Sequence, residues 1–323
     1  MNPTPNDHDG LTPFQAQPNN PMKHQRKLAL LLTAAAGLAA GAARADIPLP
    51  IPANVFANGS DGNLIINSAT PTNYCLDLSK AISGAWDAPQ SGANIGQRLG
   101  IYDAEKWAVV FKFTSVNIGA NVTICFTNHP SHAPVVWIVQ GDVRIDGRVS
   151  LDGEPGNTFA RHTEPGPGGG YGGIGETSEA IRSSDGFGWG GGLANTLAGS
   201  ASFATLGQLQ VQNTYYRDVD GIVGANYLGA SCIPLKGGSG GAGSGEVGNP
   251  YQFNIGQGSP DFAFNRSDLS GGAGGGAILI VSGRNLTVGG SISANGGASK
   301  RRTSAGIGGG GSGGAIIEAR ING

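Results

Sequence analysis

The sequence contains few charged residues. Asp, Glu, Lys and Arg make up 13% of the 323 positions, and the formal net charge is -2 at pH 7. The chain therefore lacks the basic surface that nucleic-acid binding requires, and it lacks an acidic tail for a cationic partner. Glycine is the residue in excess, at 58 positions. Because these glycines follow no strict Gly-X-Y period along the chain, collagen is excluded.

No apolar run is long enough to favour a membrane span. The longest, LALLLTAAAGLAAGAA at 28–43, is shorter than the roughly 20 residues that cross a bilayer. Basic residues precede it and Ala43-Arg44-Ala45 follows, which is typical of a signal peptide cleaved after Ala45. A transmembrane anchor is the alternative interpretation. We expect a secreted protein, extracellular or at the cell surface, that is not integral to a membrane, with Met22 as the true start.

Cysteine is scarce, and the number is odd. In an oxidising compartment the three thiols can pair, and Cys75 and Cys125 both lie in the N-terminal part of the mature chain. Cys232 lies apart from them in the loop-like stretch GASCIPLKGG. We predict a disulfide between Cys75 and Cys125, with three separate buried thiols as the alternative, because spacing alone does not determine connectivity.

Alternating apolar and polar residues predict strands in two related regions. The stretch WAVVFKFTSVNIGANVTICFTN (107–128) alternates for most of its length, and PVVWIVQGDVRIDGRVSLDGEPG (134–156) continues it as short strands separated by glycine. The stretch IVSGRNLTVGGSISANGG (280–297) repeats this pattern when Gly141 is set opposite Gly283 and one residue is inserted. GGGGSGGAIIEARING (308–323) repeats the segment that begins at Ser270. Internal similarity of this kind predicts an all-β fold, a parallel β-solenoid.

Within the later repeat, alternate apolar residues are expected to fill a narrow interior while small polar residues face solvent. The expected interior residues are Leu279, Val281, Leu286, Val288, Ile292 and Ala294, and the expected outward residues are Ser282, Thr287, Ser291 and Ser293. Glycine suits the corners, where the backbone bends sharply and stacked coils lie about 4.8 Å apart.

Long glycine tracts accompany the strands, and two interpretations are open. The tracts are either flexible Gly/Ser linkers or a tightly packed glycine layer, which the recurrence of GGxGGGAI before a strand favours. The expected organisation is an N-terminal extension plus signal peptide at 1–45, an N-terminal cap region at 46–106, and a β-solenoid at 107–323 with a long irregular insert at about 155–269. The chain stops mid-pattern, so we expect a fragment.

The pattern PVVWIVQGDVRIDGRVSLDG, followed by glycine-rich arcs, SGGAGGGAILIVSGRNLTVGGSISANGG and GGGGSGGAI, resembles a group of uncharacterised glycine-rich secreted bacterial proteins with β-helical repeats. This resemblance covers about 107–323 and implies a right-handed parallel β-helix in an exported surface or matrix protein. It implies no catalytic residue. More distantly the pattern resembles the pectin lyase-like polysaccharide enzymes, whose carboxylate and basic constellation has no match in this sequence.

Acidic residues offer the first candidates for chemistry. Polysaccharide-cleaving β-helices need two or three carboxylates, or bound calcium and a base, on neighbouring coils. Asp142, Asp146 and Asp152 recur near successive corners, but the later repeat replaces them, which favours solvated corner residues. Asp218 and Asp220 in YYRDVDG are weak calcium candidates that lack the other oxygen ligands of a calcium loop.

Histidine and aromatic residues supply the remaining candidates. His129 and His132 in NHPSH have a workable spacing for a metal, but without a third ligand an exposed loop is the better interpretation. The residues with ring systems suited to ligand stacking are Trp86 and Trp189, which lie in glycine- or proline-bounded loops, and Tyr215 and Tyr216. Trp137 lies in an apolar strand and is expected in the core.

These observations favour a secreted, non-enzymatic structural or adhesive protein that needs no cofactor. Its expected partners are extracellular polysaccharide or cell-surface components. The alternative is a polysaccharide lyase or hydrolase on the same fold, which a cluster of carboxylates on one face would reveal.

Overall fold

The computed structural model describes residues 59–88, 92–157, 161–175, 183–194, 198, 200–203, 235–244, 269–299 and 308–320. The chain divides into two units, Met1–Arg44 and Ala45–Gly323, and every described residue lies in the second. Strands predominate there, and helix is confined to the short 3-10 turns Leu78–Lys80 and Gly92–Asn94. The described part is therefore all-β, as the alternating pattern predicts, and its strand pairs are parallel except for β4 with β5.

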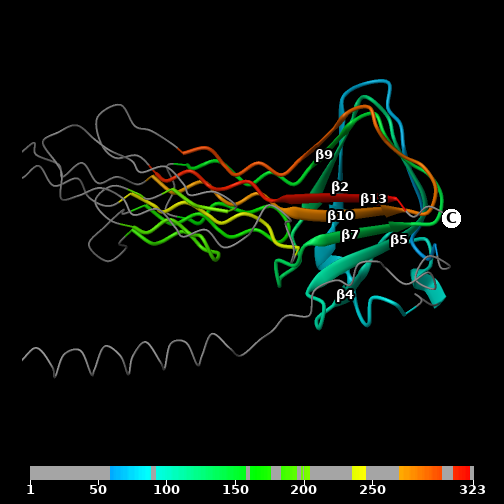
Figure 1. The fold of residues 1–323 in the computed structure, drawn as a ribbon, viewed down its shortest axis with the longest axis horizontal. Helices are drawn as coiled ribbons and strands as arrows, with labels where there is room; N and C mark the ends of the chain where they lie inside the picture. The colour runs from blue at the N-terminus through cyan, green and yellow to red at the C-terminus, as the bar shows by residue number, and fades with distance from the viewer. Residues whose placement is uncertain are drawn as a thin grey trace, which may run out of the picture. The chain divides into compact units, whose positions relative to one another are not determined.

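The strands form two sheets (Figure 1). The larger has the order β11-β8-β5-β7-β10-β13 with β1, β3 and β4 attached, and the smaller has the order β12-β9-β6-β2. The bounds in the larger sheet are β1 (Gly62–Ile66), β3 (Ile82–Ser83), β4 (Ile101–Asp103), β5 (Ala108–Ile118), β7 (Val135–Val139), β8 (Val143–Ile145), β10 (Ala277–Ser282), β11 (Leu286–Val288) and β13 (Ala315–Arg320). Those in the smaller sheet are β2 (Thr72–Asp77), β6 (Val122–Thr127), β9 (Arg148–Ser150) and β12 (Ser291–Ser293).

The two related regions stack directly on each other. Strands β7, β8 and β9 pair in register with β10, β11 and β12, and β10 pairs with β13 as the third echo of the repeat predicts. The pairing keeps one constant offset, so the expected insertion is wrong. Asp142 rather than Gly141 sets the corner, because its carboxylate accepts the N–H of Asn285 at 3.0 Å. Matching glycine to glycine misplaced the register by one residue.

Residues of the expected cap region also contribute to both sheets. β1 pairs with the second half of β5, and β2 pairs with β6. Cys75 lies directly opposite Cys125 in that second pair, and the two form a disulfide with Cα atoms 4.3 Å apart. The predicted pairing of these cysteines is confirmed.

The main core lies between the sheets and is built from alternate residues of each strand. Its largest fully buried members include Trp137, Phe111 and Phe113, with the Phe113 and Trp137 rings edge to face at 5.8 Å. The expectation that Trp137 belongs to the core is confirmed.

A second apolar cluster covers the other face of β5, β7 and β10. It contains Leu279 and Val281, while Ile278 and Ile280 face the main core, so the predicted inward face of β10 is wrong. Alternation could not reveal this, because central parallel strands are buried on both faces. Ser282 is likewise buried rather than exposed, and its hydroxyl donates to Gly141 O at 2.9 Å. In β11 and β12, Leu286 and Ile292 are only partly buried, and Val288 is exposed, so its predicted inward position is wrong.

The glycine tracts lie side by side next to the ends of the strands (Figure 1) and hydrogen-bond to one another. The name glycine bundle is used below for residues 151–157, 164–175, 183–194, 235–244, 269–276, 294–299 and 308–314. Within these ranges the expectation of an ordered glycine layer is confirmed, and the flexible-linker alternative is wrong.

Hydrogen bonds from the tract 269–276 have a three-residue period. Successive N–H groups donate to three different neighbouring tracts, and the same neighbours recur after three residues. Three residues per turn is the geometry of the polyproline II helix, which makes no internal hydrogen bonds and leaves its N–H groups for its neighbours. The donor and acceptor pairs are Gly271 to Gly173, Gly272 to Gly309, Ala273 to Glu154, Gly274 to Gly170, Gly275 to Ser312 and Gly276 to Leu151.

Close approach between tracts explains the glycine content. A Cβ atom on Gly240 would overlap the carbonyl group of Tyr171 on the neighbouring tract. Side chains recur instead at third positions, as with Tyr171 and Ile174, or with Ser239 and Ala242. A helix with three residues per turn can therefore face its neighbours with glycine and present one row of side chains elsewhere.

Candidate functional site

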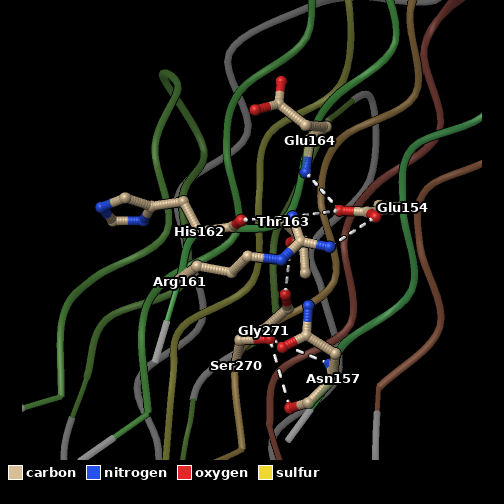
Figure 2. Close-up of polar contacts among 8 residues, drawn as sticks. All are labelled: Glu154, Asn157, Arg161, His162, Thr163, Glu164, Ser270 and Gly271. Carbon is tan, nitrogen blue, oxygen red and sulfur yellow. Dashed lines mark hydrogen bonds and ion pairs between the residues drawn. The ribbon is translucent and has the colours of Figure 1, made fainter. Parts of the chain in front are cut away.

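A polar clamp joins the start of the glycine bundle to its second tract (Figure 2). Arg161 donates to both carboxylate oxygens of Glu154, at 2.9 and 3.1 Å. The N–H of Glu164 also donates to Glu154, at 2.9 Å, while the Glu164 carboxylate points away from it. Burial would raise the pKa of Glu154, but the hydrogen bonds from Arg161 and Glu164 hold it below its ordinary value. Glu154 is thus a structural carboxylate.

Below the clamp, hydroxyl groups hold the tract 269–276 in place (Figure 2). The buried Thr163 hydroxyl donates to Gly271 O at 2.6 Å, and the Ser270 hydroxyl accepts the N–H of Asn157 at 2.9 Å. Every polar side chain in these contacts satisfies a backbone group or an ion-pair partner. The cluster therefore anchors the bundle rather than facing a ligand.

Beside this clamp lies a cluster of histidine and aromatic rings. Tyr171 Oη lies 2.6 Å from His132 Nε2, and the two rings meet edge to face at 4.6 Å. His162 packs edge to face on Phe187 at 5.0 Å, and Tyr171 does so at 6.1 Å. The loop after β6 is thereby joined to the tracts 164–175 and 183–194.

The electrostatics of this cluster determine the protonation states of its rings at neutral pH. Burial raises the pKa of Tyr171, and the nearby Glu164 carboxylate raises it further, so the phenol keeps its proton. Burial lowers the pKa of His132 despite the opposing effect of Glu164, and burial with His132 nearby lowers that of His129. Both imidazoles are therefore neutral at pH 7.

The two tryptophan candidates have opposite environments. Trp86 is only 6% exposed and packs in the second apolar cluster, so its expected role as an exposed ligand platform is wrong. The backbone N–H of Trp86 donates to the Asp103 carboxylate at 2.9 Å, which fixes that loop against the sheet. Trp189 is 67% exposed, and Lys236 Nζ lies 4.8 Å from the centre of its ring.

The aspartates that recur near the corners are structural. Asp142 accepts the N–H of Asn285 at 3.0 Å and Asp152 that of Asn295 at 2.7 Å, so each links one of the two related regions to the other. Asp146 accepts from Arg144 at 2.7 Å. Each of these three carboxylates is therefore engaged by a backbone or side-chain donor.

The remaining candidates fall outside the described residues: Ala45, Tyr215, Tyr216, Asp218, Asp220 and Cys232. Within the described ranges, no group of three His, Cys, Asp or Glu side chains is placed to hold a metal ion. None of the helices in the same ranges is long and apolar enough to cross a membrane.

The chain matches no protein-family model, and comparison with curated proteins and with solved structures likewise gives no match. Function must therefore be argued from the residues themselves.

Two parts of the site were not found from sequence. In the stretch GFGWGGG the sequence candidate was Trp189 and not Phe187, although two large rings within one glycine tract are unusual. The role of Tyr171 was also overlooked, and the signal was local: GGYGGIG and GGSGGAG both place their side chains three residues apart.

Proposed function

We propose that this protein is a secreted, non-enzymatic structural or adhesive component of the cell surface or extracellular matrix. The observation that carries the proposal is a contrast between carboxylates that have hydrogen-bond partners and large apolar side chains that are exposed. The carboxylates of Glu154, Asp142 and Asp152 bind backbone or arginine partners. By contrast, the large apolar side chains exposed on the glycine bundle include two aromatic rings, Phe187 and Trp189, together with Leu193. Such a surface suits adhesion better than bond cleavage.

The proposed scaffold is a right-handed parallel β-solenoid that carries the glycine bundle. Two features support it: successive strands return to the same two sheets with constant register, and crossover connections between parallel strands are nearly always right-handed. A framework in which each coil bonds only to its neighbours can be long and stiff with little charge.

The alternative is a polysaccharide lyase or hydrolase, and one observation favours it. Tyr171, His132 and Glu164 bring acid–base side chains together. The raised pKa of Tyr171 opposes a role for its phenol as the base in such an enzyme, because a catalytic base must lose its proton near the working pH.

The test is to incubate the purified full chain with intact cells, with matrix material and with a panel of polysaccharides. Adhesion without release of reducing ends or unsaturated products supports the proposal. Product release that disappears in Tyr171→Phe would overturn it in favour of the enzyme. Failure to associate with any surface or matrix material would overturn the adhesive role as well.

A further inference from the structure

Large side chains are distributed unevenly over the glycine bundle. The tracts 235–244 and 269–276, which hydrogen-bond to neighbours on several sides, carry serine and alanine at their third positions apart from Lys236 at the start of the first tract. The tract 183–194 instead carries Phe187 and Trp189, which are 49% and 67% exposed. Exposure of two rings only two residues apart in sequence contributes little to folding and is typical of a binding surface.

A tight turn presents these two rings. Gly188, between them, has a φ of 104°, a conformation that favours glycine, and the N–H of Gly191 donates back to Gly188 O at 3.3 Å. The N–H of Gly190 donates to the buried hydroxyl of Ser239 at 3.0 Å. A side chain on Gly188 would collide with that same serine. The turn is therefore fixed to the neighbouring tract rather than free to reorient.

Each ring also has its own support. His162 and Tyr171 both pack edge to face on Phe187, with ring centres 5.0 and 6.1 Å away. Lys236 Nζ lies 4.8 Å from the centre of the Trp189 ring, a cation–π contact. Rings held in place before binding lose little conformational entropy when a ligand arrives.

The charges around the rings do not favour an acidic ligand. Lys236 is the nearby cation and is already engaged with Trp189. Arg161 is neutralised by Glu154. Among the described residues, Glu164 lies on the tract of the supporting Tyr171 and Asp185 on the tract of Phe187 and Trp189, so an anionic polymer would meet more negative than positive charge.

We propose that Phe187 and Trp189 form a two-ring platform that binds a neutral polysaccharide. The flat C–H face of a sugar ring packs on the electron-rich face of an aromatic ring, and uncharged hydroxyl groups tolerate the mixed charges nearby. The platform deepens the adhesive function proposed above and rests on it, because it names the surface and the ligand class.

The test is retention of the full chain on cellulose, chitin and a soluble neutral β-glucan, with alginate and polygalacturonate as the acidic comparison. Wild-type protein is expected to bind at least one neutral polysaccharide. Trp189→Ala is expected to weaken that binding about tenfold or more, as for an aromatic hot spot, and Phe187→Ala with Trp189→Ala to abolish it. Ile95→Ala is the matched control, since Ile95 is also exposed, at 58%, but lies on a different segment.

Neither ring belongs to the buried clusters, so each variant is expected to fold. The melting temperature of each variant checks this expectation. Stronger retention by the acidic polymers, unchanged binding by the double variant, or no binding to any neutral polysaccharide would each overturn the platform. If the double variant adheres to cells as well as wild type does, the platform is overturned but the adhesive function is not. Release of soluble sugar products would overturn the adhesive function itself.

Discussion

Replacing Gly311 by alanine would test whether the glycine bundle requires glycine where its tracts meet. The new Cβ would overlap the carbonyl group of Ala273, with the carbonyl carbon 2.5 Å away. Non-bonded carbons ordinarily approach no closer than about 3.5 Å, so the two tracts must separate by about 1 Å. That movement stretches the hydrogen bond between the same two tracts from the Gly275 N–H to Ser312 O, now 2.9 Å. Overpacking costs roughly 1 to 3 kcal/mol and a weakened hydrogen bond about 1 kcal/mol more.

We therefore expect Gly311→Ala to lower the free energy of unfolding by roughly 2 to 4 kcal/mol and the melting temperature by about 10 °C. Gly310→Ala is the control in the same tract, because the nearest atoms to its Cβ lie 3.9 Å away. It should be neutral, or stabilising by up to about 1 kcal/mol through reduced entropy of the unfolded chain. Calorimetry on both variants decides the matter. Equal melting temperatures would refute the argument that close contacts, rather than composition, select glycine.

Three further predictions follow from the strands and the buried charges. Replacing both Cys75 and Cys125 by serine removes a cross-link between residues 50 positions apart. The free energy of unfolding, measured with denaturant, should fall by about 4 kcal/mol, and reductant should lower it no further in this variant. Burial would raise the pKa of Asp152, but hydrogen bonds from Asn295, Ser150 and Ser293 and the charge of Arg148 hold it below 3.8. The ionised Asp152 carboxylate therefore stabilises the fold above pH 3.8, and this stabilisation is lost as the pH falls through the folded pKa. Wild-type protein should lose stability in acid more steeply than Asp152→Asn. Burial lowers the pKa of Lys112 below 10.5 despite Asp87 and Asp61. The folded protein thus loses this proton before the unfolded chain does, and melting scans should show stability rising toward pH 10.5 in wild type but not in Lys112→Met.

Much of the strand architecture could be predicted from sequence. Alternation located β5 through β9 and β10 through β12, and the repeat correctly paired the start of β10 with that of β13. Alternation failed to predict which residues of β10 face the main core, because both faces of this strand are apolar and buried. The repeat failed at the corner, where the carboxylate of Asp142, not a shared glycine, sets the register.

The candidate site was harder to predict, because its residues are brought together by the glycine tracts. Trp86 and Trp189 have similar flanking residues, yet one is buried by strands distant in sequence and the other is not. The pairing of Tyr171 with His132 depends on which tract lies next to the loop after β6. Composition revealed the glycine tracts but not which tracts lie side by side. The three-residue spacing of side chains is the sequence signal that bears on how the tracts pack.

The three-residue period of the glycine bundle determines which insertions and deletions its tracts can tolerate. Removing one residue from the tract 235–244 would turn every later side chain by about 120° around the tract axis. Ala242 would then point toward a neighbouring backbone, and a glycine would take its place on the permitted row. Removing three residues would shorten the tract by one turn and leave the row intact. Tolerated insertions and deletions in these tracts should therefore come in multiples of three, whereas strands preserve their faces through changes of two.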